Sequence, residues 1–144
     1  MWGVVLFYMS LVLCASLTGV FWFMHVAYYP AFRYIAPDLW GQFFKKRFQN
    51  TSMVVYPMMA FETLAALALF FMMLRYRVSG SYTAATFLLF GIWAWNLLFL
   101  NRRMKSLEQN PSPTNFRDLE KASLVRATGY TLRLLLLVGG LIGS

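Results

Sequence analysis

The sequence predicts an all-α integral membrane protein, a four-helix up-down bundle, and three observations lead to that class. Of the 144 residues, 60% are hydrophobic and only 12% are charged, whereas a soluble domain has about 25% charged residues. Four apolar stretches, at about 2–29, 52–74, 82–100 and 123–143, each approach the ~20 residues that cross a ~30 Å hydrocarbon core. The alternating ten-residue segments of a membrane β-barrel are absent. We therefore expect residues 1–144 to form a single transmembrane domain.

The first apolar stretch is expected to remain in the mature protein as a helix. It has no basic n-region and is much longer than the apolar core of a secretory signal peptide. Cys14 follows three bulky residues, which does not suit a lipoprotein cleavage site, so we interpret it as a small buried hydrophobic residue. The chain has one cysteine and one histidine, His25, which excludes a zinc motif and a bis-histidine haem within one chain. We predict no metal and no cofactor.

The 13 basic and 5 acidic residues give a net charge of +8, and their distribution predicts an orientation. Two basic residues, Arg75 and Arg77, lie on the short middle connection, and Arg133 falls inside the last apolar stretch. By the positive-inside rule, the two long connections are cytoplasmic and both termini lie outside. No nucleic-acid-binding motif accompanies the basic residues, so we expect membrane lipids as partners and no nucleic acid. The other ten basic residues lie on the two long connections and their helix edges: Arg33, Lys45, Lys46, Arg47, Arg102, Arg103, Lys105, Arg117, Lys121 and Arg126.

The first long connection is predicted to contain an amphipathic helix over about 38–48. Aromatic residues recur there every fourth position beside a basic run, which is typical of a helix lying in the membrane interface. Such a helix would dock a lipid headgroup or a partner, or it would only anchor the connection. The predicted membrane-interface residues are Trp40, Phe44, Lys45, Lys46, Arg47 and Phe48.

The second long connection contains a break in the helical pattern. The four residues from Asn110 to Pro113 read Asn-Pro-Ser-Pro, a combination that marks a turn. Asn115, followed by Asp118, is the predicted N-cap of the last helix. That helix is therefore expected to begin well before it enters the membrane.

Polar side chains within the apolar stretches predict an intramembrane network. Glu62 lies roughly 15 Å into its stretch, near the midplane, and the spacing of Arg126, Tyr130 and Arg133 puts them on one helix face. A charged group at this depth costs about 2.5–3.5 kcal/mol, so we predict a Glu62–Arg133 ion pair. The seven residues of the predicted network are His25, Tyr29, Glu62, Asn96, Arg126, Tyr130 and Arg133.

This network has two readings, one structural and one functional. A buried ion pair fixes the register of packed helices. The functional reading is a pocket for a small amphiphilic or lipid-like ligand, in which Arg133 or Arg126 holds an anionic group. Catalysis is a weaker reading, because a carboxylate such as Glu62 beside an arginine stays ionised and is a poor acid. An accessory subunit of a larger membrane complex is an alternative, and the Gly139/Gly143 pair permits a homo-oligomer.

Three segments of the chain resemble a group of small bacterial four-helix membrane proteins of uncharacterised function. They are Tyr28-Tyr29-Pro30-Ala31-Phe32, the run from Pro57 to Glu62, and the Arg126, Tyr130, Arg133 series. By position, the resemblance marks Tyr29, Pro30, Glu62, Arg126 and Arg133, and it implies a four-helix fold in a bacterial inner (cytoplasmic) membrane without an established activity. More remotely, the layout is similar to anthrone-oxygenase-like membrane proteins, which implies a small membrane oxygenase as a further alternative.

The sequence departs from that group at its histidines. Relatives have histidines before the Tyr-Pro pair, in the first long connection and after the third helix. Here those places hold Tyr28, residues such as Phe44 and Arg47, and the run from Arg102 to Lys105. If those histidines support metal or redox chemistry, this chain lacks the ligands, so the sequence favours a membrane protein that is not an enzyme.

Overall fold

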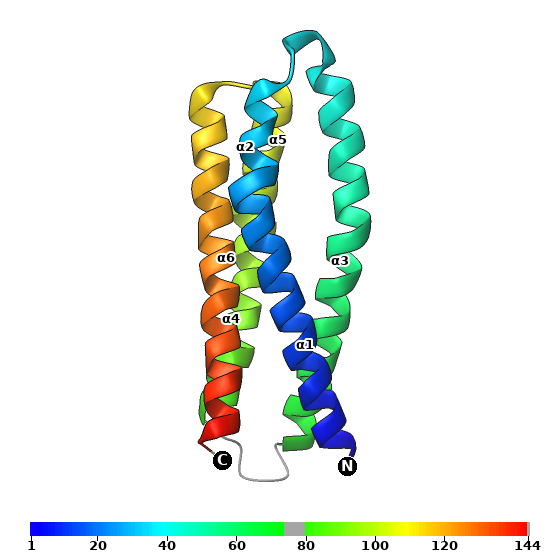
Figure 1. Ribbon diagram of the computed structural model, residues 1–144, viewed down its shortest axis with the longest axis vertical. Coiled ribbons are helices and arrows are strands. Elements are labelled where there is room, and N and C mark those ends of the chain that lie inside the picture. Colours follow the sequence, from blue (N-terminus) through cyan, green and yellow to red (C-terminus); the bar gives the residue numbers. More distant parts are fainter. Residues whose placement is uncertain (74–79, 144) are drawn as a thin grey trace.

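The computed structural model describes residues 1–73 and 80–143, and these residues form four long helical segments that run alternately up and down (Figure 1). All four are long and apolar enough to cross a membrane, and the described residues contain no strand. The prediction of an all-α four-helix bundle is confirmed, and the chain is a multi-pass membrane protein. Arg75 and Arg77 lie outside the described residues.

Three of the four segments consist of more than one helical piece. The first comprises α1 (Trp2–Phe23), η1 (Met24–Tyr28), α2 (Tyr29–Ala31) and η2 (Phe32–Tyr34). The second comprises η3 (Pro37–Leu39) and α3 (Trp40–Met73). The third comprises α4 (Gly80–Trp95), η4 (Asn96–Leu100) and α5 (Asn101–Gln109). The fourth is the single helix α6 (Pro113–Ile142). Here η1 and η4 are π-helical turns, whereas η2 and η3 are 3₁₀ turns.

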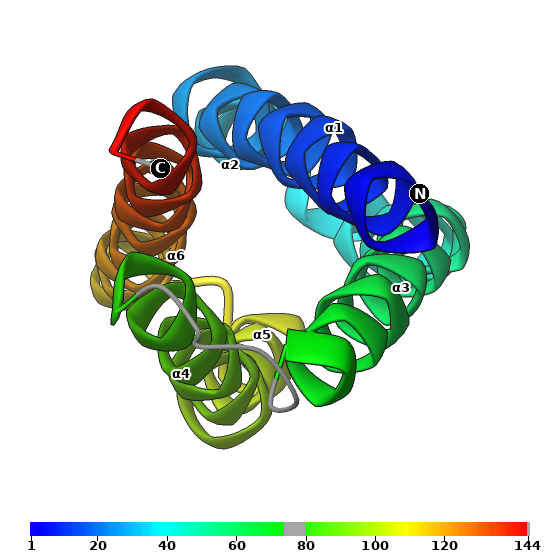
Figure 2. The same ribbon diagram turned by 90° about the horizontal axis from the view of Figure 1, so that it is seen from below.

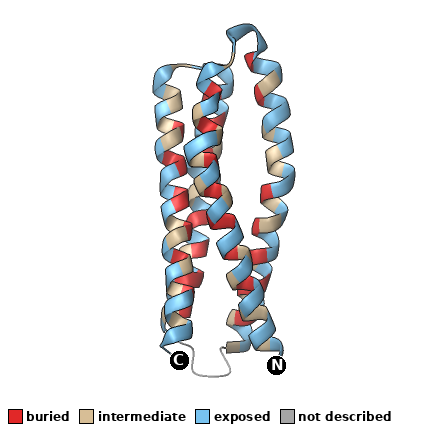
Figure 3. Cartoon of the chain, viewed as in Figure 1, coloured by how far each residue is buried: buried red, intermediate tan, exposed pale blue. Residues whose placement is uncertain are grey.

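Seen along the bundle, the segments follow one another around a ring in the order α1, α3, α4, α6 (Figure 2). The α1 helix packs against α3 and α6, and α6 packs against α4. Gly129 of α6 permits close approach to α4, because a Cβ there would lie 3.2 Å from Cγ1 of Ile92. Buried residues follow the inward faces of the helices (Figure 3). The outward faces display large apolar side chains, as a lipid-exposed surface requires.

The two ends of the bundle differ in chemistry. The connections at 32–39 and 110–112 lie together at one end, and both termini lie at the other (Figure 1). Nine of the ten basic residues assigned to the long connections are exposed, and we call the end that carries them the basic end. The tenth, Arg126, is buried inside the bundle. Arg126 was counted among the orienting charges and was also assigned to the predicted intramembrane network, and the structure places it in the interior.

Helix α3 begins at Trp40, twelve residues before the apolar stretch at 52, and includes most of the predicted 38–48 segment. Its 34 residues span roughly 51 Å, longer than a ~30 Å hydrocarbon core. The apolar face of this segment points into the protein: Trp40 and Phe44 are 5% and 2% exposed. The indole Nε1 of Trp40 donates to the Leu107 carbonyl at 3.2 Å. This face therefore contacts other helices instead of a lipid surface, while the adjacent Lys45, Lys46 and Arg47 are exposed.

The break between α5 and α6 is confirmed, but the cap of α6 differs from the prediction. Ser112 is the N-cap, and its side chain accepts a hydrogen bond from the Asn115 backbone N–H at 3.2 Å. Pro113 occupies the first helical position, where a missing N–H has no cost. The Asn115 side chain instead donates to the carbonyls of Asn110 and Ser106, which closes the turn. The Asn115 prediction was wrong because Ser112 precedes a proline that already suits the helix start.

Candidate functional site

The seven polar residues predicted as one network fall into three places. Glu62, Tyr130 and Arg133 form a fully buried group, which we call the Glu62 cluster. Tyr29, Asn96 and Arg126 line a pocket closer to the basic end. His25 lies apart, half-buried at the boundary between the first segment and α6, where Nδ1 of its ring is 3.3 Å from the Ser123 hydroxyl. His25 therefore belongs to neither group.

The Glu62 cluster contains the predicted ion pair. Arg133 Nη1 contacts Glu62 Oε1, and both side chains are 0% exposed. The Tyr130 hydroxyl donates to the other Glu62 oxygen at 3.1 Å, and Arg133 Nε donates to the Ala85 carbonyl at 3.2 Å. Arg133 Nη2 is the one buried polar atom of the cluster without a hydrogen-bond partner in the described part of the chain. The charges of the cluster cancel, and its polar atoms are directed at one another.

Arg126 is also buried, but no acidic residue neutralises it. Its side chain is 5% exposed, and the described residues form three ion pairs, none of which includes it. The guanidinium lies 4.0 Å from the centre of the Phe21 ring, and Nη2 donates to the Tyr29 hydroxyl at 3.2 Å and lies 3.8 Å from the Met24 sulfur. Nε is buried with no hydrogen-bond partner among the described residues. Among residues 1–73 and 80–143, the buried charged groups are thus two guanidinium groups and a single carboxylate.

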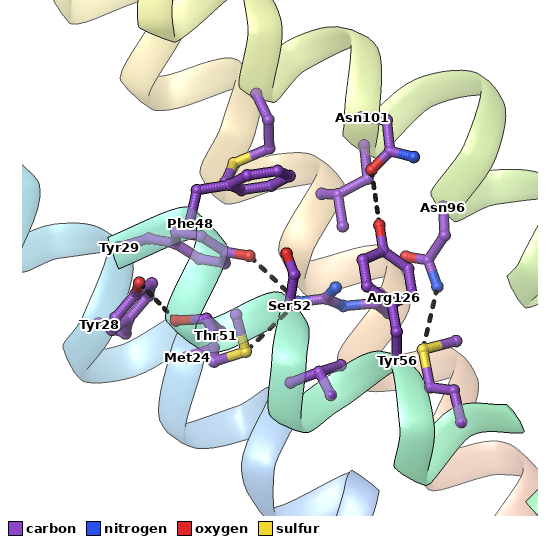
Figure 4. Close-up of a pocket in the computed structure, with 14 residues that line it drawn as sticks. Met24, Tyr28, Tyr29, Phe48, Thr51, Ser52, Tyr56, Asn96, Asn101 and Arg126 are labelled. Carbon is purple, nitrogen blue, oxygen red and sulfur yellow. Dashed lines mark hydrogen bonds between the residues drawn. The ribbon is translucent and has the colours of Figure 1, made fainter. Parts of the chain in front are cut away.

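Arg126 borders a pocket of about 40 Å³ between the upper half of α3 and the other segments (Figure 4). Arg126 is the one charged residue among its lining residues. The Asn96 amide contacts the Met59 sulfur at 3.9 Å through its nitrogen, while its Oδ1 is buried without a partner in the described chain. The complete lining is Met24, Tyr28, Tyr29, Phe48, Thr51, Ser52, Val55, Tyr56, Met59, Asn96, Leu100, Asn101, Met104 and Arg126.

Two hydroxyl bridges tie α3 to its neighbours across this pocket (Figure 4). The Tyr28 hydroxyl is 2.8 Å from the Thr51 hydroxyl, which joins η1 to α3. The Tyr56 hydroxyl donates to Asn101 Oδ1 at 3.1 Å, which joins α3 to α5. These four polar groups therefore satisfy one another, and the polar groups left for a ligand are mainly those of Arg126, Asn96 and Ser52.

Two π-turns and two prolines lie at the level of the pocket. The π-turns η1 and η4 each contribute two lining residues, and π-turns are frequent at functional sites. Pro30 lacks an N–H and follows η1 closely, so the preceding turn cannot keep the regular i to i−4 pattern there. On α3, Pro57 lies between the lining residues Tyr56 and Met59, inside a continuous helix.

Sequence reasoning missed most of the α3 wall of this pocket. Thr51, Ser52 and Tyr56 lie where the apolar stretch begins, and they read as ordinary interfacial residues because hydropathy does not show which face of a helix they occupy. Phe48 was predicted to face the membrane interface, and the structure places it in the pocket lining. The useful signal was the pair of prolines, Pro30 and Pro57, because each removes a backbone N–H donor from a helical segment beside the pocket.

The sequence and the fold were compared with protein-family models, curated proteins and solved structures, and none of the three comparisons gave a match. The described residues contain no group of three or more His, Cys, Asp or Glu side chains that could hold a metal ion. The site must therefore be interpreted from its own geometry, and its distinctive feature is a buried cation beside a pocket.

Proposed function

We propose that this membrane protein binds a small amphiphilic ligand with an anionic group, which pairs with Arg126 in the pocket between α3 and the other segments. The single observation that carries the proposal is the buried guanidinium of Arg126, which lines a pocket and has no acidic partner among the described residues. Burying an isolated charge costs several kcal/mol. An anionic ligand would offset that cost.

The Glu62 cluster is a poor candidate for the same role. Glu62 and Arg133 neutralise each other, and no residue of the cluster lines the pocket. A ligand would have to break the ion pair to reach either charge. We therefore assign the cluster to the stability of the bundle and the Arg126 pocket to binding.

The proposed orientation supports access from the cytoplasmic leaflet of a bacterial inner membrane. We propose that the basic end is cytoplasmic, because nine exposed basic residues lie there and positive residues concentrate on that side. The pocket lies nearer to this end than Glu62 does, because its α3 lining, residues 48–59, precedes Glu62 on a helix that begins at the basic end. An anionic amphiphile approaching along that leaflet would meet a favourable electric field.

Native mass spectrometry of the full chain in lipid nanodiscs tests the proposal. The protein purified from its native membrane should carry a bound small molecule, and the variant R126Q should lose it. The matched control is R102Q, which removes the same charge from an exposed position at the same end. R102Q should keep the ligand.

A bare wild-type protein, or the same bound molecule in R126Q, would contradict the proposal. Reproducible association with a second protein chain would instead favour the accessory-subunit alternative. Circular dichroism of both variants establishes that loss of the ligand does not reflect loss of the helices.

A further inference from the structure

We infer that the ligand is a single-chain fatty carboxylate, whose carboxylate binds Arg126 and whose chain lies along the apolar wall of the pocket. This inference rests on the proposed function and names the chemical class of the ligand. It follows from the charge of the pocket, the donor geometry of Arg126, the remaining hydrogen-bonding groups and the apolar lining.

The charge of the lining selects a monoanion. Arg126 contributes one positive charge, and none of the other lining residues is ionic. A carboxylate neutralises that charge completely, whereas a phosphate monoester carries close to two negative charges at neutral pH and would leave one of them buried. The exposed lysines and arginines of the basic end do not line the pocket, so they cannot neutralise a second charge there.

The donors of Arg126 favour a planar group. A guanidinium presents parallel N–H donors that fit the two oxygens of a carboxylate. The unpartnered Nε–H of Arg126 is one such donor.

The neighbouring polar groups leave few further donors. The Tyr29 hydroxyl accepts from Arg126, and its own hydrogen can donate to a bound oxygen. Ser52 on α3 supplies a second hydroxyl, whereas the other polar side chains of α3 already bond to Tyr28 and Asn101. These two hydroxyl groups suit one small headgroup rather than a free hydrated anion.

The rest of the lining accommodates an aliphatic chain. Six of the lining residues have side chains without a hydroxyl, amide or charged group: Met24, Phe48, Val55, Met59, Leu100 and Met104. Methionine adapts its shape to flexible apolar ligands. Phe48 is half-buried, so this apolar wall of the pocket reaches the protein surface.

The test uses four probes and the full chain in phosphatidylcholine nanodiscs, with binding measured by native mass spectrometry. Palmitate is compared with hexadecanol and hexadecyl phosphate, which share its chain length, and with acetate, which lacks the chain. We expect palmitate to bind at least about 10-fold more tightly than hexadecanol, as for loss of a charge-assisted hydrogen bond. R126Q should weaken palmitate binding by about 10-fold or more, and R102Q should leave it unchanged.

Each of the following results would contradict a specific part of the inference. If hexadecyl phosphate binds more tightly than palmitate and depends on Arg126, the carboxylate inference fails while the proposed function stands. If acetate binds as tightly as palmitate, the site holds a small anion and the amphiphilic ligand is excluded. If no probe binds in an Arg126-dependent manner, the inference fails, and the retained ligand in the native preparation decides the proposed function separately.

A second pair of variants keeps the test valid if R126Q does not fold. S52F places a ring in the pocket and keeps the arginine, whereas M53F adds the same ring at the neighbouring, 75% exposed position. Palmitate binding should fall about 10-fold or more in S52F and stay at the wild-type level in M53F. Equal binding by the two variants would place the fatty chain outside this pocket and overturn the inference.

Discussion

Two buried arginines on the same helix face have opposite surroundings. Arg133 pairs with Glu62, which also accepts from Tyr130, and the group lies where the four helices enclose it completely. Arg126, seven residues earlier, has an aromatic ring, a hydroxyl and a thioether around it, and no carboxylate in the described chain. In the first arrangement the two charges neutralise each other without a ligand. In the second, Arg126 has no counter-charge among the described residues, and we propose that this difference separates a structural charge from a binding charge.

The largest expected effect is in the Glu62 cluster. E62Q leaves Arg133 as an uncompensated charge in the bundle interior, and breaking a buried pair in this way costs about 3–5 kcal/mol. The free energy of unfolding, measured in detergent micelles or bicelles, should fall by that amount. The matched variant R126Q removes a buried charge that has no acidic partner, so the free energy of unfolding of the ligand-free protein should stay the same or rise.

The double variant E62L/R133M provides the control for this comparison. Replacing both partners by apolar residues removes the unpaired charge, so much of the lost stability should return. A double-mutant cycle with no coupling between the two positions would contradict the ion pair.

The next effect belongs to the ligand. At palmitate concentrations about 100 times its dissociation constant, binding should raise the unfolding free energy of the wild-type protein by about 2.7 kcal/mol. R126Q should show no such increase, whereas E62L/R133M should keep it because the pocket is intact. Thermal unfolding with and without palmitate measures both, and stabilisation of R126Q equal to the wild type would remove Arg126 from the site.

The same contrast explains which contacts the sequence could predict. Glu62 is the one acidic residue in the four apolar stretches, and Arg133 is the one basic residue deep inside them. Because an isolated charge in the hydrocarbon core is energetically costly, the sequence alone predicted that the two form an ion pair. Arg126 lies near the start of its apolar stretch, where a positive charge usually marks topology. Its burial depends on α6 beginning at Pro113 and packing against η1, and hydropathy reports neither.

The fold itself was predictable because membrane-spanning length and composition fix the helix number, but the helix ends were not. Hydropathy finds only the portion of α3 within the lipid, whereas the helix extends back to Trp40 through a polar stretch. An aromatic helix face like that of the extension can lie either on a membrane surface or in a protein interior, and the sequence does not distinguish the two. The Leu107 carbonyl that accepts from Trp40 belongs to α5, and no local pattern connects it to α3.

A pair of tyrosine variants compares the two arginines through one hydroxyl each. Y130F removes the bond to the fully buried Glu62 carboxylate, and hydrogen bonds to charged groups contribute about 1.5–3 kcal/mol. Y29F removes the hydroxyl that accepts from Arg126 beside a pocket that has room for water, so the loss should stay under about 1 kcal/mol. The free energies of unfolding of the two variants, measured in the same bicelles, test this difference in lost stability. Equal losses would mean that water is excluded equally from the surroundings of Glu62 and of Arg126.

The smallest expected effect concerns the bridges that hold α3 beside the pocket. Y56F breaks the bond to Asn101 and Y28F breaks the bond to Thr51, and each should cost about 0.6 kcal/mol, the mean for interhelical hydrogen bonds in a bilayer. Through a local opening of α3, that cost corresponds to roughly 3-fold faster amide exchange around residues 48–56. Amide exchange near Glu62 should not change in either variant, because the cluster makes no contact with these bridges. Hydrogen-exchange mass spectrometry resolves the two regions, and faster exchange near Glu62 would show that the closed cluster and the open pocket form a single cooperative unit.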